Sequence, residues 1–210
     1  MDGGISRAAI LPIALAVAYP LLSHASVLLH APLLQWLALC CFAAVPLAAG
    51  LMARRARSWL IFIAIALLLW AVTHIGGGQY ALYLPPLVFT ATLASTFALS
   101  LRKGHTPLIV TFAAIARGGE LPPDLAAYCR KLTAFWACMV AAIFATTLYL
   151  TLFGPLWLWS WHTNFASYVV IGAVFIAEFF LRRIWFAHLP HGSFWQYLKF
   201  MTRVRAGDLR

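Results

Sequence analysis

Glu178 is the one acidic residue that lies well inside an apolar segment of membrane-spanning length, so it is the first candidate for chemistry. A carboxylate in such a segment is costly to bury, and it usually serves transport, proton transfer or a charge pair. Arg182 follows four residues later, at the spacing that brings two side chains together on one helix face. The spacing predicts an intramembrane ion pair between Glu178 and Arg182, with a proton relay as the alternative.

Four histidines are predicted near the outer ends of the apolar segments. Imidazoles bind metal ions, and two that face each other across helices can hold a haem. No His-x3-His or His-x2-Glu spacing is present, and no acid lies nearby to act as a further ligand. We therefore predict no metal and no cofactor, although the sequence leaves open whether the four side chains converge: His24, His30, His74 and His162.

The remaining catalytic motifs are weak, and no catalytic residue is predicted. His105 and Asp124 are too far apart in sequence for the His-x4-Asp motif of acyltransferases, which needs both residues on one local turn. The run HIGGGQ, residues 74–79, lacks the Lys-Ser/Thr of a phosphate-binding loop. No serine nucleophile elbow occurs, and the cysteines form no CxxC pair. A non-catalytic protein is the favoured interpretation.

The composition identifies the solvent in which these residues must fold. The chain has 210 residues, of which 64% are hydrophobic and 10% charged, and its mean hydropathy is +0.89. A soluble domain is about half apolar and about a quarter charged. The excess of apolar residues, in long runs rich in Ala and Leu, predicts helices that cross a bilayer. We expect one all-α integral membrane domain.

Six segments are predicted to span the membrane. The helix that contains the fifth of them is expected to begin earlier, near Pro123. Prolines mark predicted helix starts at Pro32 and at the pair Pro85 and Pro86. Residues 74–83 and 154–163 are predicted to be loops. The predicted spans are residues 8–24, 32–52, 59–73, 84–101, 132–153 and 164–185.

The distribution of charge predicts the orientation of these spans. Fifteen Lys and Arg residues and five acids give a net charge of +10. The segments 25–31, 74–83 and 154–163 contain neither Lys nor Arg. Because basic residues remain in the cytoplasm, both termini are predicted to be cytoplasmic. The opposite ends of the spans carry aromatic residues typical of an interfacial belt: Tyr80, Tyr83, Trp157, Trp159 and Trp161.

Residues 102–136 form the longest polar stretch, and they are predicted to be the main cytoplasmic surface. Thr106 and Pro107 are expected to cap and begin a short interfacial helix that ends near Arg117. A basic amphipathic helix is expected near the C-terminus, from Ser193 to about Val204. The residues predicted to contact anionic lipid headgroups or an acidic protein are Arg102, Lys103, Arg117, Arg130, Lys131, Lys199, Arg203 and Arg205. Because the charge follows one membrane face, nucleic acid is not an expected partner.

Two runs carry a resemblance to known families. They are HTPLIVTFAAIARGGELPPDLAAYCRKLTAFWA, residues 105–137, and WSWHTNFASYVVIGAVFIAEFFLRR, residues 159–183. They look like an uncharacterised family of small bacterial inner-membrane proteins encoded with the synthases of aryl polyene (xanthomonadin-type) pigments. The motifs PLI, GELPPDL and LTAFWA are more distantly similar to intracellular septation protein A, which has no established catalytic site. The resemblance covers about residues 59–185.

The expected function follows from the one-sided charge, the lack of a catalytic motif and this resemblance. We expect a multi-pass accessory or scaffold protein of the bacterial inner membrane. Its basic face would hold acyl-chain enzymes, or their acidic acyl carrier protein, against the bilayer. A small transporter or flippase for a lipid-like product is the first alternative, and a membrane acyl- or glycosyltransferase is the second. The sequence leaves the oligomeric state and the substrate open.

Overall fold

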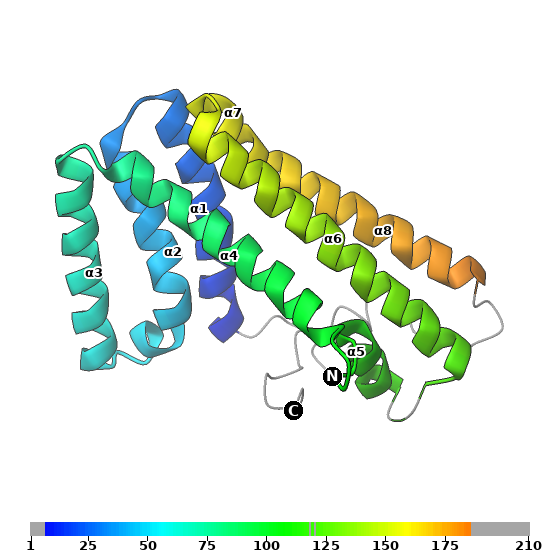
Figure 1. Ribbon diagram of the computed structural model, residues 1–210. Coiled ribbons are helices and arrows are strands. Elements are labelled where there is room, and N and C mark those ends of the chain that lie inside the picture. The colour runs from blue at the N-terminus through cyan, green and yellow to red at the C-terminus, as the bar shows by residue number, and fades with distance from the viewer. Residues whose placement is uncertain (1–6, 118, 120, 186–210) are drawn as a thin grey trace. The chain divides into compact units, whose positions relative to one another are not determined.

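The computed structural model describes residues 7–117, 119 and 121–185 of the chain. The predicted C-terminal helix, with Lys199, Arg203 and Arg205, lies outside the described residues. Within them all regular secondary structure is helical and no strand is present (Figure 1). The elements are α1 (Arg7–Leu28), α2 (Pro32–Met52), α3 (Ala56–His74), α4 (Gly78–Ser100), α5 (Leu108–Arg117), α6 (Pro123–Phe153), α7 (Leu156–Trp161), the π-helical turn η1 (His162–Ala166) and α8 (Ser167–Trp185).

Six helical segments are long and apolar enough to cross a membrane, which confirms the predicted all-α class and its six candidate spans. An isolated helix of this kind satisfies its backbone hydrogen bonds internally, as the bilayer requires. The segments are Ile10–Leu28, Pro32–Met52, Ala56–His74, Gly78–Ser100, Pro123–Phe153 and Leu156–Trp185. The second segment, Pro32–Met52, has the predicted bounds. The third, fourth and sixth begin earlier than predicted, and the first ends later, at Leu28.

The chain forms two compact units. The first comprises Met1–Val88 and Thr146–Val169, and the second comprises Phe89–Ala145 and Val170–Arg210. In the first unit α1, α2 and α3 run side by side (Figure 1). Small residues let the helix backbones approach closely, and α2 has a buried row of them at Ala44 and Ala48. The core of this unit is formed by Tyr19, Ala38, Leu39, Leu82, Leu150 and Trp159.

In the second unit the short helix α5 is attached to two long helices through side-chain hydroxyls. The amide of Leu108 donates to Ser100 Oγ of α4 at 3.1 Å, and the amide of Ile109 donates to Thr133 Oγ1 of α6 at 3.3 Å. These bonds satisfy two amides of the first turn, which a helix cannot bond internally. The helix therefore begins at Leu108, and hydroxyls distant in sequence occupy the capping role that was predicted for Thr106.

The predicted loop 74–83 was largely wrong. The chain reverses over Ile75 to Gly77, where Gly76 has φ of 85°, and α4 begins directly afterwards at Gly78. Pro85 and Pro86 consequently lie inside α4 and not at its start. Membrane-spanning helices tolerate internal proline because neighbouring groups satisfy the freed carbonyls. The rule that proline marks a helix start comes from soluble proteins and does not account for this tolerance.

The predicted loop 154–163 was also largely wrong, because helix begins at Leu156. Pro155 precedes it in an extended conformation, with φ of −68° and ψ of 142°. The apolar run that follows has no water to bond its backbone in a bilayer, so the helical state is favoured. The helix continues through η1, a turn with π-helical hydrogen bonding, into α8.

Candidate functional site

The ion pair of α8 is the most strongly buried charge in the described chain. Glu178 Oε1 lies 3.4 Å from Arg182 Nε, and the two side chains are 11% and 22% exposed, respectively. Their spacing of four residues places both on one face of the helix. The predicted pair is thus present in the structure, and the arginine offsets the cost of burying the carboxylate.

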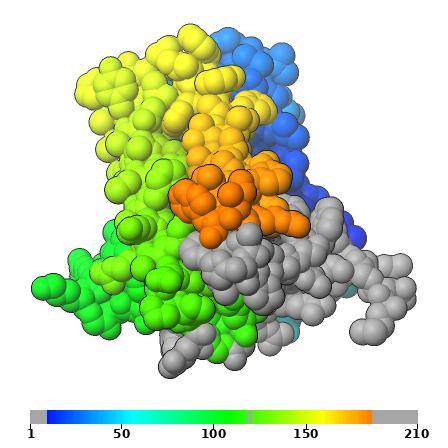
Figure 2. Space-filling model, turned by 90° about the vertical axis from the view of Figure 1, so that its right-hand side faces the viewer, coloured from blue at the N-terminus to red at the C-terminus, as the bar shows by residue number. Residues whose placement is uncertain are grey.

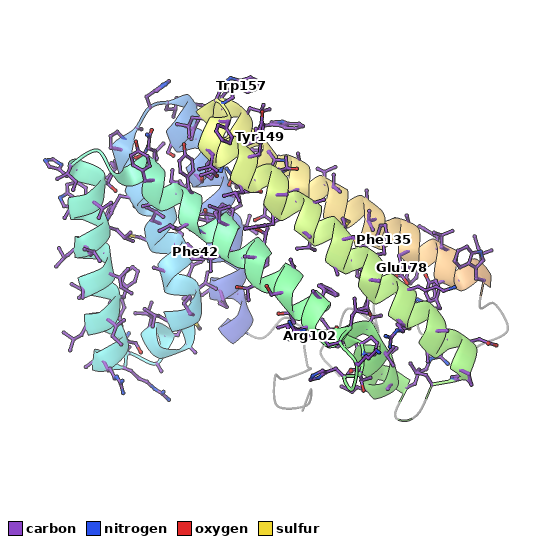
Figure 3. All side chains as sticks on the ribbon, in the orientation of Figure 1. Phe42, Arg102, Phe135, Tyr149, Trp157 and Glu178 are labelled. Atoms are coloured by element: carbon purple, nitrogen blue, oxygen red, sulfur yellow. The ribbon has the colours of Figure 1, made fainter. Side chains whose placement is uncertain are left out.

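Tyr128 of α6 completes this site and was missed by sequence reasoning. Its hydroxyl donates to Glu178 Oε1 at 3.4 Å, which is long for an O–H···O hydrogen bond. Its ring also packs edge-on against Trp185, with the centroids 5.9 Å apart. Figure 2 shows the last turns of α8 lying against α6, and Figure 3 shows Glu178 at this contact. Because Tyr128 is fifty residues from Glu178, no local spacing could indicate the contact.

A second polar cluster lies where α1 meets α7 and η1, in the first unit. The Oγ of Ser160 is 3.0 Å from His24 Nδ1 and accepts a hydrogen bond of 3.1 Å from Asn164 Nδ2. Asn164 Nδ2 also lies 3.4 Å from Ser23 Oγ of α1. A serine beside a histidine can form a nucleophile–base pair, but Ser160 is fully buried and therefore inaccessible to a substrate. The cluster is best explained as interhelical hydrogen bonding.

The π-helical turn explains how Asn164 reaches this cluster. One extra residue in a helical turn rotates the side chains that follow, and such turns recur at functional sites. In η1 the side chain of Asn164 is buried and bonds to both the Oγ and the carbonyl oxygen of Ser160. The sequence gives no signal for a π-helical turn, so its position could not be predicted.

The four histidines considered for metal or haem binding have separate environments. The ring of His24 packs edge-on against Phe165 at 4.7 Å between centroids, whereas His74 stacks on Trp70 at 5.9 Å. His162 Nε2 lies 3.4 Å from Ser167 Oγ, and His30 is exposed in the turn after α1. The described residues contain no group of three or more His, Cys, Asp or Glu side chains placed to bind a metal ion.

The basic residues predicted to contact partners are exposed wherever the structure describes them. The second unit holds seven Lys and Arg residues in its described part, and its described acids are Asp124 and Glu178. Glu178 is engaged with Arg182, so Asp124 is the described acid of this unit that remains exposed. Five predicted contact residues make up what we term the basic surface: Arg102, Lys103, Arg117, Arg130 and Lys131.

A groove between α2 and α3 has a different chemistry, because only apolar and aromatic residues line it. Its volume is about 320 Å³. Trp36 anchors it by donating from Nε1 to the carbonyl oxygen of Ala66 at 2.8 Å, and its ring packs edge-on against Trp70. The lining comprises Trp36, Trp59, Phe62, Ile63, Ala66, Leu67 and Trp70. Such a surface is compatible with the acyl chains of a bilayer.

We expect Ser100→Ala to loosen α5 by about 1 kcal/mol, the usual effect of removing a helix-capping hydroxyl. The variant leaves the Leu108 amide without its side-chain acceptor. Hydrogen–deuterium exchange of residues 108–117 measures the effect as faster exchange. Thr96→Ala is the matched control, since its hydroxyl bonds only within α4, to the carbonyl oxygen of Thr92 at 2.8 Å. Equal exchange in both variants would contradict the capping role of Ser100.

Comparison with protein-family models, curated proteins and solved structures gives no match for this chain. The fold and the site therefore define only a class: an α-helical protein with six candidate membrane spans. Its described features are a buried ion pair, a buried polar cluster and an exposed basic surface.

Proposed function

We propose that this chain is a non-catalytic accessory protein of the bacterial inner membrane that holds an acidic soluble protein against the bilayer. The observation that carries the proposal is the basic surface, whose five cations are all exposed. Exposed cations attract an acidic partner and speed its association. An acyl carrier protein fits this description, and the resemblance to proteins of aryl polyene biosynthesis favours the same choice.

The proposed orientation has both termini in the cytoplasm. The connections at residues 29–31, 75–77 and 154–155 contain no Lys or Arg, whereas those at 53–55 and 101–107 do. This alternation is the pattern of a multi-pass protein that keeps its basic connections inside. Helix α5 is ten residues long, too short to span, and we place it at the cytoplasmic interface. There it would present Arg117 beside the basic end of α6.

The basic surface predicts a salt-dependent interaction with acyl carrier protein. We expect the protein, in nanodiscs of a zwitterionic lipid, to bind it at low salt and to release it at about 0.5 M salt. Replacing both Arg130 and Lys131 with Gln should weaken binding about fivefold, because exposed charge pairs contribute about 1 kcal/mol or less. Microscale thermophoresis measures both effects. Replacing Arg54 and Arg55, which are equally exposed but belong to the first unit, should leave the affinity unchanged.

Two results would contradict the proposed accessory function. One is the absence of salt-sensitive binding at any protein concentration tested. The other concerns orientation: a cysteine introduced in place of Lys103 should resist an impermeant thiol reagent added from the periplasm. Labelling of that cysteine would place the basic surface on the wrong side of the membrane.

A small transporter or flippase is the second candidate, and the prolines within the spans favour it. Proline occurs inside α1, α2 and α4, and broken helices commonly line transport pathways. The buried polar cluster of Ser23 and Asn164 is the second supporting feature. Transfer of a fluorescent lipid across liposomes, dependent on Asn164, would support this candidate over the accessory role. An acyl- or glycosyltransferase is less favoured, because the two described serines beside a histidine, Ser160 and Ser167, are both buried.

A further inference from the structure

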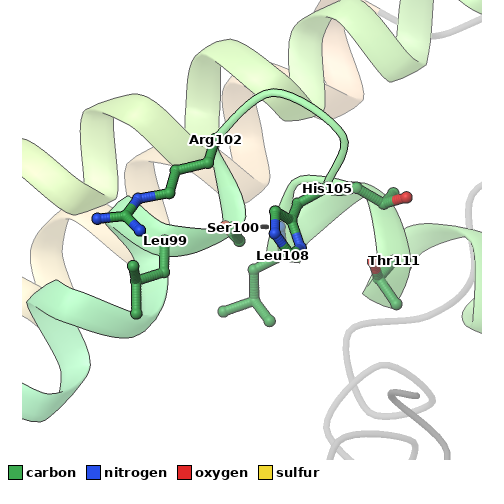
Figure 4. Close-up of a pocket in the computed structure, with 7 residues that line it drawn as sticks. Leu99, Ser100, Arg102, His105, Leu108 and Thr111 are labelled. Carbon is green, nitrogen blue, oxygen red and sulfur yellow. Dashed lines mark hydrogen bonds between the residues drawn. The ribbon is translucent and has the colours of Figure 1, made fainter.

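We infer that the cavity between the end of α4 and the start of α5 binds the phosphate group of an anionic glycerophospholipid. The cavity has a volume of about 330 Å³ and lies wholly in the second unit (Figure 4). It is lined by Leu99, Ser100, Arg102, His105, Thr106, Leu108 and Thr111. This inference is independent of the acidic protein partner, since it concerns a lipid ligand and one cavity of the basic surface.

The polar side of the cavity suits a phosphodiester. The guanidinium group of Arg102 has five N–H donors in a planar fork, a geometry that matches two phosphate oxygens. His105 can donate through a ring N–H in either neutral tautomer, and Thr106 adds a hydroxyl donor. Among the described residues the ion pair joins Glu178 and Arg182, and no described carboxylate pairs with Arg102. Within this part of the chain, the guanidinium charge can therefore serve a ligand.

The apolar side indicates a lipid as the source of the phosphate. Leu99 and Leu108 line the same cavity, and their side chains extend in the same direction in Figure 4. A free phosphate ion gains nothing from leucine side chains, whereas the glycerol and first acyl carbons of a phospholipid do. Leu99 belongs to the last turn of a candidate span, the depth at which lipid headgroups meet the hydrocarbon.

Local hydrogen bonds hold the cavity in shape before any ligand binds. Ser100 Oγ donates to the carbonyl oxygen of Phe97 at 2.8 Å and accepts from the Leu108 amide, so its single O–H donor is already used. Thr111 Oγ1 is directed to the carbonyl oxygen of Pro107 at 3.4 Å. The chain turns at Gly104, whose φ of 87° favours glycine. Recognition of the anion therefore falls to Arg102, His105 and Thr106.

Native mass spectrometry of the purified full chain tests the inference, with dioleoyl phosphatidylglycerol and dioleoyl phosphatidylcholine as probes. We expect one phosphatidylglycerol to bind in preference to phosphatidylcholine. Arg102→Gln should reduce its affinity about tenfold, the usual effect of losing a charge-assisted hydrogen bond. Arg183→Gln is the control: it removes the same charge from an exposed arginine of the same unit that neither lines the cavity nor belongs to the basic surface. Its affinity should change no more than about threefold.

Two further experiments distinguish a specific lipid site from general charge attraction and from a free-phosphate site. Arg102→Lys keeps the charge without the planar fork, so we expect it to recover part of the lost affinity and thereby to support the site. Equal losses in Arg102→Gln and Arg183→Gln would show general attraction to positive charge and overturn the inference. Inorganic phosphate added to the lipid-free protein is expected to give no Arg102-dependent thermal stabilisation. Such stabilisation would assign the cavity to free phosphate and overturn its assignment to a lipid.

Discussion

Trp159→Ala is expected to lower the free energy of unfolding by about 3 kcal/mol, whereas Trp157→Ala and Trp161→Ala should each lower it by less than about 1 kcal/mol. The three tryptophans alternate along α7, yet their environments differ sharply. Trp159 is 1% exposed, while Trp157 and Trp161 are 60% and 54% exposed, respectively. Figure 3 shows Trp157 projecting beyond the end of α7.

The large effect at Trp159 has a packing cause. Its ring meets Tyr83 of α4 edge-on at 4.8 Å between centroids and belongs to the core cluster with Tyr19, Leu39 and Leu82. Alanine would leave a cavity that rigid neighbouring helices close only in part. Trp159 Nε1 donates to no acceptor among the described residues, so the loss comes from packing and not from a hydrogen bond.

Unfolding by sodium dodecyl sulfate in mixed micelles, followed by circular dichroism, measures all three variants on one scale. Trp157→Ala and Trp161→Ala serve as controls for the loss of an indole in the same helix. Similar destabilisation by the three substitutions would contradict the buried role of Trp159. It would favour instead the interfacial anchoring that the sequence suggested for all three residues.

Glu178→Gln is expected to destabilise the fold by about 2 kcal/mol and to reduce the yield of folded protein. Removing one partner of a buried ion pair leaves the other charge uncompensated, which costs about 3 to 5 kcal/mol when burial is complete. We expect less here because Arg182 is 22% exposed and glutamine still accepts a hydrogen bond. The same micelle unfolding assay checks the value.

A double-mutant cycle separates the pair from its surroundings. Arg182→Gln alone should destabilise, while the combined variant should recover part of the loss, because no unpaired charge then remains. Asp124→Asn is the control for losing a carboxylate in this unit. It is exposed in the first turn of α6 and should cost no more than about 1 kcal/mol through the helix dipole. Full stability of Glu178→Gln together with abolished transport would instead indicate a proton relay.

Sequence reasoning succeeded where the signal is local. Apolar length identified all six spans, and the four-residue spacing identified Glu178 with Arg182. It failed where helix starts depend on the solvent. Rules from soluble proteins place a proline pair at a helix start, and residues 154–163 were predicted to be a loop, whereas a bilayer favours helix in both segments.

The rest of the candidate site depends on contacts between segments distant in sequence. Tyr128 reaches Glu178 across fifty residues, and Asn164 reaches Ser23 across 141. Neither contact follows from any periodicity, because it depends on which helix faces pack together. The burial of Trp159 between its two exposed neighbours has the same origin, since alternating tryptophans look alike until a neighbouring helix covers one of them.

The hydroxyls that hold α5 come from two different long helices. Ser100 belongs to α4 and Thr133 to α6, and their hydroxyl oxygens accept hydrogen bonds from the consecutive amides of Leu108 and Ile109. Sliding α6 along α4 by one turn, about 5.4 Å, would break at least one of these two hydrogen bonds. Both hydrogen bonds therefore form together only at a single register of α4 and α6, so a ligand bound to α5 would respond to any shift of one helix along the other.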